Sequence, residues 1–183
     1  MTQWIIFIAG SIFLVAISWK SLRKPRTHGF YRFFAWECIF LLFLVNIKYW
    51  FKDPFAWYQI IAWILLFVSL IPLGYGVHFL RTRGNPAKQR EGDESLLAFE
   101  KTTNLVTTGI YKYIRHPLYS SLLFLAWGIF FKLPSLTGIS LTAVATAFLF
   151  ATARADEAEC IQFFGPQYID YMKRTKMFIP KVF

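Results

Sequence analysis

Long apolar runs occupy most of this chain and restrict the folds open to it. The runs over residues 3–19, 30–51 and 55–80 approach or exceed the roughly 20 predominantly apolar residues that an α-helix needs to cross a bilayer. Only 16% of the residues are charged, whereas soluble domains contain about 25%. The first run has no small-residue cleavage site before Lys20, which indicates a retained helix rather than a signal peptide. The sequence therefore predicts an integral membrane protein.

Two shorter apolar segments, residues 118–131 and 133–150, follow a long polar loop. Pro134 lies at the bend between them, and the first segment is short for a complete crossing. We expect these segments to form a helical hairpin, and we leave open whether its first arm spans the bilayer. Because no linker or internal repeat divides the chain, the prediction is an all-α membrane protein of one domain, residues 1–183, with about five transmembrane helices.

The basic residues are distributed unequally between the two ends of these spans. Of the 20 Lys and Arg residues, Lys48, Lys52 and Lys132 fall at one end and the others fall at the opposite end. Because cytoplasmic loops are enriched in Lys and Arg, we expect the N-terminus outside and the C-terminus in the cytoplasm. The net charge of +10 then favours anionic lipid headgroups. Nucleic-acid binding is not expected, since the basic residues flank spans instead of forming a separate domain.

A polar segment immediately before the predicted hairpin carries Arg115, His116 and Pro117 in succession. A helix that begins at Pro117 has backbone N–H groups without intrahelical partners in its first turn, where proline is well tolerated. Such a helix start attracts anions. Arg115 and His116 add side-chain donors at the same place. The sequence thus predicts a site for an anionic group at the membrane surface.

A second polar cluster follows the last apolar segment and contains Arg154, Asp156, Glu157 and Glu159. Charges close to a helix that emerges from lipid are costly unless they are compensated. Arg154 and Glu157 are spaced i, i+3, so a surface ion pair is the simpler interpretation of this cluster alone. If both polar clusters face the same interface, they form one functional site. The three His residues are too scattered to predict a metal site.

In combination, these segments resemble one family of enzymes. The chain contains, in order, LVTTGIYKYIRHPLY, an apolar hairpin, an acidic pair, FFG and QYIDYMKR. This set resembles the small integral-membrane methyltransferases, a group that includes isoprenylcysteine carboxyl methyltransferase and the phospholipid N-methyltransferases. The resemblance extends over residues 81–180, whereas the first two spans match only as generic membrane helices.

The resemblance implies S-adenosylmethionine as cofactor, bound at the cytoplasmic face. This molecule carries an ammonium, a carboxylate, a sulfonium and a flat adenine, so its site needs carboxylates, N–H donors and apolar walls. Asp156 and Glu157 correspond to the family's acidic pair and are expected to bind the ammonium. The complete set of implied cofactor contacts is Thr103, Asn104, Leu105, Val106, Tyr111, Arg115, His116, Pro117, Leu118, Asp156 and Glu157.

The chain departs from the family pattern at several positions. Ser121 replaces a glycine and Asp156 replaces the first glutamate, and neither change removes the required chemistry. The isoprenylcysteine enzymes place an arginine four residues before their cofactor-binding glutamate, where this chain has Ala153. Arg154 is the nearest candidate. The expected catalytic residues are therefore Arg154, on the substrate side, and Arg115, which positions the cofactor. The acceptor stays open among a carboxylate, an amine and a thiol.

The sequence thus predicts methyl transfer from S-adenosylmethionine to a lipid-like or otherwise amphiphilic acceptor at the cytoplasmic membrane face. One alternative is a membrane reductase with a nicotinamide cofactor, which would use the basic loop but not the acidic pair. Another is a non-catalytic scaffold or transporter, which would place polar residues at mid-membrane rather than at one edge. Tyr168 and Tyr171 are expected to anchor a tail helix among lipid headgroups rather than to contact a ligand.

Overall fold

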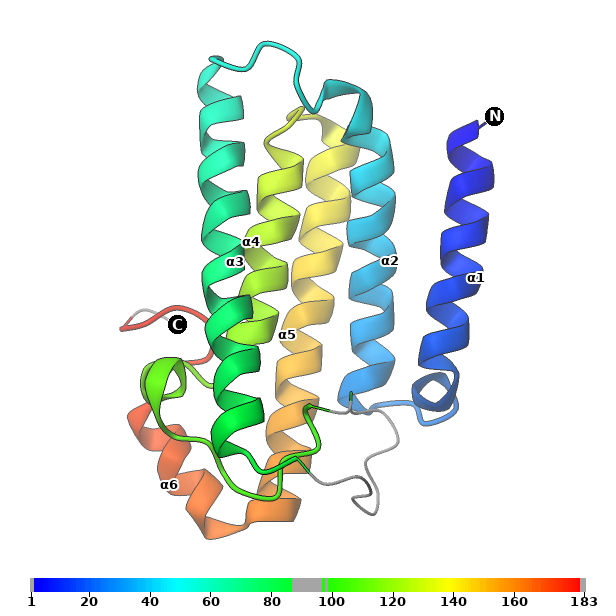
Figure 1. The fold of residues 1–183 in the computed structure, drawn as a ribbon. Helices are drawn as coiled ribbons and strands as arrows, with labels where there is room; N and C mark the ends of the chain where they lie inside the picture. The colour runs from blue at the N-terminus through cyan, green and yellow to red at the C-terminus, as the bar shows by residue number, and fades with distance from the viewer. Residues whose placement is uncertain (1, 87–96, 98, 182–183) are drawn as a thin grey trace.

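The computed structural model describes residues 2–86, 97 and 99–181 and shows a bundle of helices (Figure 1). Four helices are long and apolar enough to cross a membrane, and two isolated bridges are the only β-pairing among the described residues. The predicted all-α membrane fold is confirmed. The helices are α1 Thr2–Leu22, α2 His28–Asn46, α3 Trp57–Arg83, α4 Pro117–Phe130, α5 Leu136–Phe164 and α6 Pro166–Arg174, with short 3-10 turns at Ile47–Tyr49 and Gly109–Lys112.

The bundle consists of two main helix pairs joined through the α4–α5 hairpin. Helix α3 packs along α4 and α2 packs along α5, while α1 packs on α2 and stands at the edge of the bundle (Figure 1). Leu42, Ala126 and Ala145 are fully buried at the meeting of α2, α4 and α5. Small residues such as these two alanines let helix backbones approach closely in a membrane.

The predicted hairpin is confirmed, and its first arm is short. Helix α4 has 14 residues, equivalent to about 21 Å at 1.5 Å per residue, against a hydrocarbon core about 30 Å thick. Its first residue therefore lies part-way along the bundle, and the lower ends of α3 and α5 extend beyond it (Figure 1). The recess that this leaves at the α6 end of the bundle contains the candidate site.

The opposite end of the hairpin is fixed by polar contacts around a buried lysine. Lys132 is fully buried in the α4–α5 turn, and its Nζ donates to Oε1 of Gln59 at 3.0 Å. The same Nζ lies 3.4 Å from the centre of the Trp63 ring, a cation–π contact. The Asn46 amide donates to the carbonyl of Ile129 at 2.8 Å. These contacts join the α4–α5 turn to α2 and α3 at this end of the bundle.

Helix α5 is longer than its apolar run predicts. The predicted apolar segment ends at residue 150, but the helix continues without interruption to Phe164. Its last turns carry Asp156, Glu157 and Glu159 beyond the apolar part. Gly165 ends the helix with φ +62°, a conformation that favours glycine, and allows the chain to turn sharply into α6. The acidic residues are therefore held on a rigid helix.

Candidate functional site

A partly open cavity of about 100 Å³ lies at the α6 end between α4, α5, α6 and the segment before α4. The structure brings most of the predicted site residues to its wall. These are Leu105, Val106, Tyr111, Arg115, His116, Pro117, Leu118 and Asp156.

The segment before α4 is held in place by the chain that follows α6. The backbone N–H groups of Arg115 and His116 donate to the carbonyls of Lys176 and Met177, at 2.8 and 3.1 Å. In the first turn of α4, the Ser120 hydroxyl donates to the carbonyl of Phe178 at 2.8 Å. Residues far apart in sequence thus fix the start of α4, and the first residues of that helix, Pro117 and Leu118, line the cavity. The start of a helix has N–H groups without intrahelical partners and attracts anions.

Arg115 and Glu157 form a buried ion pair beside the cavity. The Arg115 Nη2 lies 2.7 Å from Oε1 of Glu157, and Nε donates to the same oxygen at 2.8 Å. The other carboxylate oxygen lies 3.4 Å from Nη1 of Arg154. Glu157 is almost completely buried and does not line the cavity. Its carboxylate therefore holds Arg115 in position.

His116 connects the start of α4 to both acidic residues of the predicted pair. Its Nδ1 lies 3.3 Å from Oδ2 of Asp156 and its Nε2 lies 3.4 Å from Oε1 of Glu157. The latter contact does not have hydrogen-bond geometry, and Nε2 has no hydrogen-bond partner among the described residues. Burial lowers the pKa of His116, but the two carboxylates outweigh it and raise the pKa above the ordinary 6.5. The imidazole also stacks on the Tyr119 ring, with centroids 5.4 Å apart.

Besides Glu157, three predicted site residues do not line the cavity. Thr103 and Asn104 are exposed, and their backbone N–H groups donate to the carbonyl of Gly84 at 3.0 and 3.1 Å. Their connection to the end of α3 turns this part of the loop outward. The side chain of Arg154 is 72% exposed and borders a shallow basic groove formed with residues 172–177. Arg154 thus lies on the outer side of the Arg115–Glu157 pair.

Several cavity residues were not predicted from the sequence. Tyr168 and Tyr171 are buried, and the Tyr171 hydroxyl donates to the carbonyl of Tyr111 at 2.7 Å, so their assignment to the headgroup region was wrong. Glu159 follows Asp156 by one helical turn, a periodicity that could have identified it. Nothing in the sequence links distant Glu100 to the site. The further unpredicted lining residues are Leu80, Thr102, Tyr119, Cys160 and Phe164.

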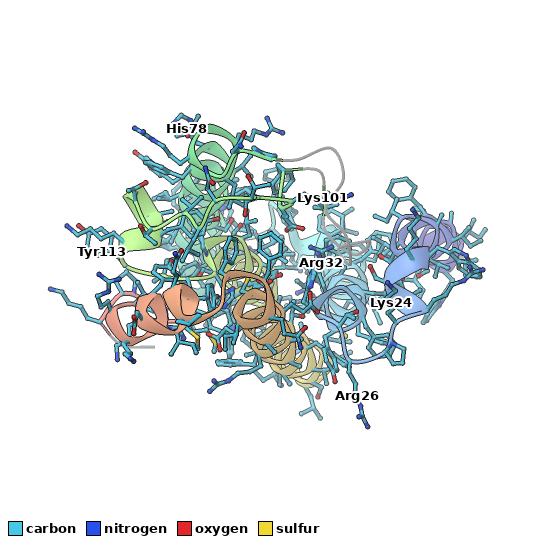
Figure 2. All side chains as sticks on the ribbon, turned by 90° about the horizontal axis from the view of Figure 1, so that it is seen from below. Lys24, Arg26, Arg32, His78, Lys101 and Tyr113 are labelled. Atoms are coloured by element: carbon cyan, nitrogen blue, oxygen red, sulfur yellow. The ribbon has the colours of Figure 1, made fainter. Side chains whose placement is uncertain are left out.

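The α6 end of the molecule is also rich in basic side chains. Figure 2 looks onto this end and shows Arg32 near the middle of the view, with Lys24 and Arg26 on the α1 side. Arg32 is buried and makes an ion pair with Glu100, at 2.9 Å between Nη1 and Oε2. Since Glu100 lines the cavity, Arg32 connects α2 to the cavity wall.

Comparison with known proteins agrees with the motif pattern. Residues 93–166 match the phospholipid methyltransferase family. Methanethiol S-methyltransferase 1 of Bradyrhizobium diazoefficiens is 25% identical over 174 residues, which cover 86% of this chain and 55% of the relative. Protein-S-isoprenylcysteine O-methyltransferase B of Arabidopsis thaliana is 35% identical over 86 residues, 45% of this chain and 43% of the relative. This chain is related to the integral-membrane methyltransferases. The resemblance drawn from its motifs is confirmed.

The match to the phospholipid methyltransferase family covers much of the part that forms the cavity. The family match includes the segment before α4, both arms of the hairpin and the acidic residues of α5. The nickel-cobalt-cadmium resistance protein NccN of Alcaligenes xylosoxydans xylosoxydans is also similar, 33% identical over 82 residues, 45% of this chain and 38% of the relative. The chain spans about half the length of the curated relatives it matches. No solved structure matches it.

Proposed function

We propose that this chain is a methyltransferase that uses S-adenosylmethionine to methylate an amphiphilic acceptor at the cytoplasmic face of a membrane. The observation that carries the proposal is the meeting of three features at one cavity. These are the start of α4, the buried His116–Asp156 contact, and the apolar wall that includes Leu105 and Val106. Each feature suits a different part of this cofactor.

The cavity residues divide among the chemical groups of the cofactor. Asp156 lines the cavity with a partly exposed carboxylate and would accept hydrogen bonds from the ammonium. The first-turn N–H groups of α4, with Arg115 beside them, would bind the carboxylate. Leu105, Val106 and Tyr111 provide an apolar wall for the adenine. Bound in this way, S-adenosylmethionine would supply the methyl group as an electrophilic sulfonium.

Glu157 has a different role in this proposal from the one that the motif implies. Its two oxygens contact Arg115, His116 and Arg154, so we assign it to positioning Arg115 and His116. Asp156 then binds the ammonium. The exposed Arg154 would contact an anionic part of the acceptor from the outer groove. The protein contributes mainly by holding the two reactants in line and excluding water, effects that are large in group transfer.

The amphiphilic character of the acceptor is supported by a second, apolar groove. This groove of about 440 Å³ lies between α1, α2 and α4 and is lined by apolar and aromatic residues, among them Trp36 and Leu122. Leu122 follows the cavity residue Tyr119 by one turn of α4. Trp36 contacts Arg32 through a cation–π interaction at 4.9 Å. An acceptor with its hydrocarbon part in the groove would therefore have its polar end near the cavity.

The orientation proposed for the protein follows from charge and from cofactor supply. The cavity opens at the α6 end, where most of the Lys and Arg residues lie. The positive-inside rule assigns this end to the cytoplasm. S-adenosylmethionine is a charged, water-soluble molecule, so a cavity at that face would receive it directly.

Methyl transfer tests the proposal. Purified protein in detergent would be incubated with S-adenosylmethionine labelled in the methyl group and with three acceptors, namely a prenylcysteine analogue, a short-chain thiol and an aminophospholipid. We expect label transfer to at least one acceptor by the wild type and by Asp170→Asn, which removes an exposed carboxylate on α6. Asp156→Asn should abolish the transfer. Absence of transfer to all three, together with no binding of the cofactor, contradicts the proposal.

A further inference from the structure

We propose that Glu159, held in place by His28, is a further cofactor-binding residue and takes a positively charged group of the ligand. The inference rests on the proposed function of the cavity. It goes beyond the family's acidic pair, because Glu159 stands outside that pair and His28 lies on a different helix.

Glu159 presents a carboxylate to the cavity from a fixed position. It lines the cavity together with Asp156, which precedes it by one turn of α5. The backbone N–H of His28 donates to its Oε1 at 2.9 Å. The His28 Nδ1 contacts its Oε2 at 2.5 Å. Both oxygens are thus anchored from the start of α2, while the side chain stays 28% exposed.

Glu157 differs from Glu159 in two properties that ligand binding requires, the exposure of the side chain and the number of acceptor positions left for a ligand. The side chain of Glu157 is only 4% exposed, and basic side chains contact both of its oxygens. A carboxylate has about four acceptor positions, and the two contacts with His28 leave Glu159 with positions to spare. Glu159 is therefore the residue that joins Asp156 as the second carboxylate of α5 on the cavity wall.

His28 has the structural properties of a positioning residue. It is fully buried at the first position of α2, which Thr27 caps. It does not line the cavity, and its Nε2 has no hydrogen-bond partner among the described residues. The backbone N–H of His28 and its Nδ1 both contact the Glu159 carboxylate. Fixing a long Glu side chain in advance removes an ordering cost that ligand binding would otherwise include.

The other acidic residues of the cavity wall are also held by basic side chains. Within the part of the chain that the structure describes, three carboxylates line the cavity, those of Glu100, Asp156 and Glu159. Each contacts a basic side chain from another part of the chain, respectively Arg32, His116 and His28. A wall with several fixed carboxylates suits a ligand with more than one positive centre, and S-adenosylmethionine has two, the ammonium and the sulfonium.

Calorimetric titration with two ligands tests the role of Glu159. S-adenosylhomocysteine carries only the ammonium, whereas sinefungin also carries an amine in place of the sulfonium. We expect Glu159→Gln to weaken the binding of sinefungin by about tenfold, the effect of one lost charge-assisted hydrogen bond. Asp170→Asn, in which an exposed α6 carboxylate is neutralised, should bind as the wild type does.

The outcomes separate this inference from the proposed function. Weaker binding of sinefungin alone assigns Glu159 to the sulfonium, and equal weakening of both ligands assigns it to the ammonium. Either result supports the inference. Wild-type affinity of Glu159→Gln for both ligands overturns it and leaves the proposed function intact. No binding of either ligand by folded wild-type protein overturns the proposed function and this inference with it.

The positioning role of His28 is tested by rescue. His28→Ala should weaken sinefungin binding, and His28→Asn should restore much of it, because the Asn amide can place an N–H near the position of Nδ1. A purely structural role would lower the melting temperature of His28→Ala without changing the affinity of the folded protein. That result overturns the positioning role. If His28→Ala does not fold, His28→Leu takes its place, because it also removes the Nδ1 donor and keeps more of the side-chain bulk. Wild-type affinity of the folded His28→Leu protein for sinefungin likewise overturns the positioning role.

Discussion

Arg115 and Glu157 form an ion pair with 2.7 Å between Nη2 and Oε1, and their side chains are only 9% and 4% exposed. Arg115 lines the cavity, whereas Glu157 lies behind it and does not line it. Arg115 Nη1 also donates to the carbonyl of Met172 at 3.3 Å, at the end of α6. This one guanidinium therefore joins the segment before α4 to both α5 and α6.

Breaking this ion pair should destabilise the protein strongly. Glu157→Gln leaves a buried guanidinium without its counter-ion, which typically costs about 3–5 kcal/mol. Arg154→Ala removes only an exposed partner of the same carboxylate, and such pairs contribute about 0–1 kcal/mol. Thermal unfolding in detergent should show a large drop in melting temperature for Glu157→Gln and little change for Arg154→Ala. An equal drop in melting temperature for both variants would contradict the stabilisation of the fold by the buried Arg115–Glu157 pair.

The stability contributed by His116 should depend on pH. Burial alone lowers the pKa of His116, but Asp156 and Glu157 raise it above 6.5 overall. The folded protein therefore binds the proton more tightly than the unfolded chain, and the resulting stabilisation is fully present below pH 6.5. It is lost as the pH rises through the raised pKa. The melting temperature of the wild type minus that of His116→Gln should therefore decrease as the pH rises through the pKa of His116. An increase in this difference would contradict the raised pKa of His116.

Two glycines of α3 should differ sharply in their tolerance of a side chain. A Cβ at Gly76 would lie 3.2 Å from Cγ of Pro117, at the start of α4, whereas a Cβ at Gly74 would meet nothing within 4 Å. Both valine substitutions have the same intrinsic effect on a helix. Displacing a reactant by about 1 Å can reduce a rate by about 100-fold. Gly76→Val should therefore slow methyl transfer by at least about tenfold, and Gly74→Val should not. Similar rates in both variants would show that α4 does not depend on this contact.

Lys132 should support the fold without affecting the cavity. Lys132→Met leaves Oε1 of Gln59 and the carbonyl of Trp50 without their donor, a cost of about 1–3 kcal/mol for a buried polar group. Lys48→Met, at an exposed position of the same end, is the control. The melting temperature should fall for Lys132→Met alone, while its affinity for S-adenosylhomocysteine stays that of the wild type. Loss of affinity would show that the two ends of the bundle are coupled.

The apolar runs predicted the fold well because each transmembrane helix satisfies its own backbone hydrogen bonds. The helix start at Pro117 was predictable for a similar reason, since it depends on local sequence alone. Neither feature depends on contacts between distant segments. From the apolar runs and the helix start at Pro117 one can predict the order of the helices, the hairpin, and the position of Arg115 and His116 at the start of α4.

The sequence could not predict the surroundings of residues that are placed by distant contacts. Tyr171 is drawn inward by the carbonyl of Tyr111, 60 residues earlier, although an isolated tyrosine near a span is typical of a headgroup anchor. Thr103 faces outward because its backbone bonds to Gly84. Glu157 faces Arg115 rather than the cavity because Arg115 is itself fixed by the chain after α6. Sequence spacing contains no information on such long-range pairs.

Binding of S-adenosylhomocysteine to purified, folded protein is the most direct test of the account. Calorimetric titration of the wild type, Asp156→Asn and Asp170→Asn would compare a cavity carboxylate with an exposed one. We expect binding by the wild type and by Asp170→Asn, and loss of binding in Asp156→Asn. Binding by Asp156→Asn with wild-type affinity, or no binding by the wild type, would contradict the assignment of this cavity to S-adenosylmethionine.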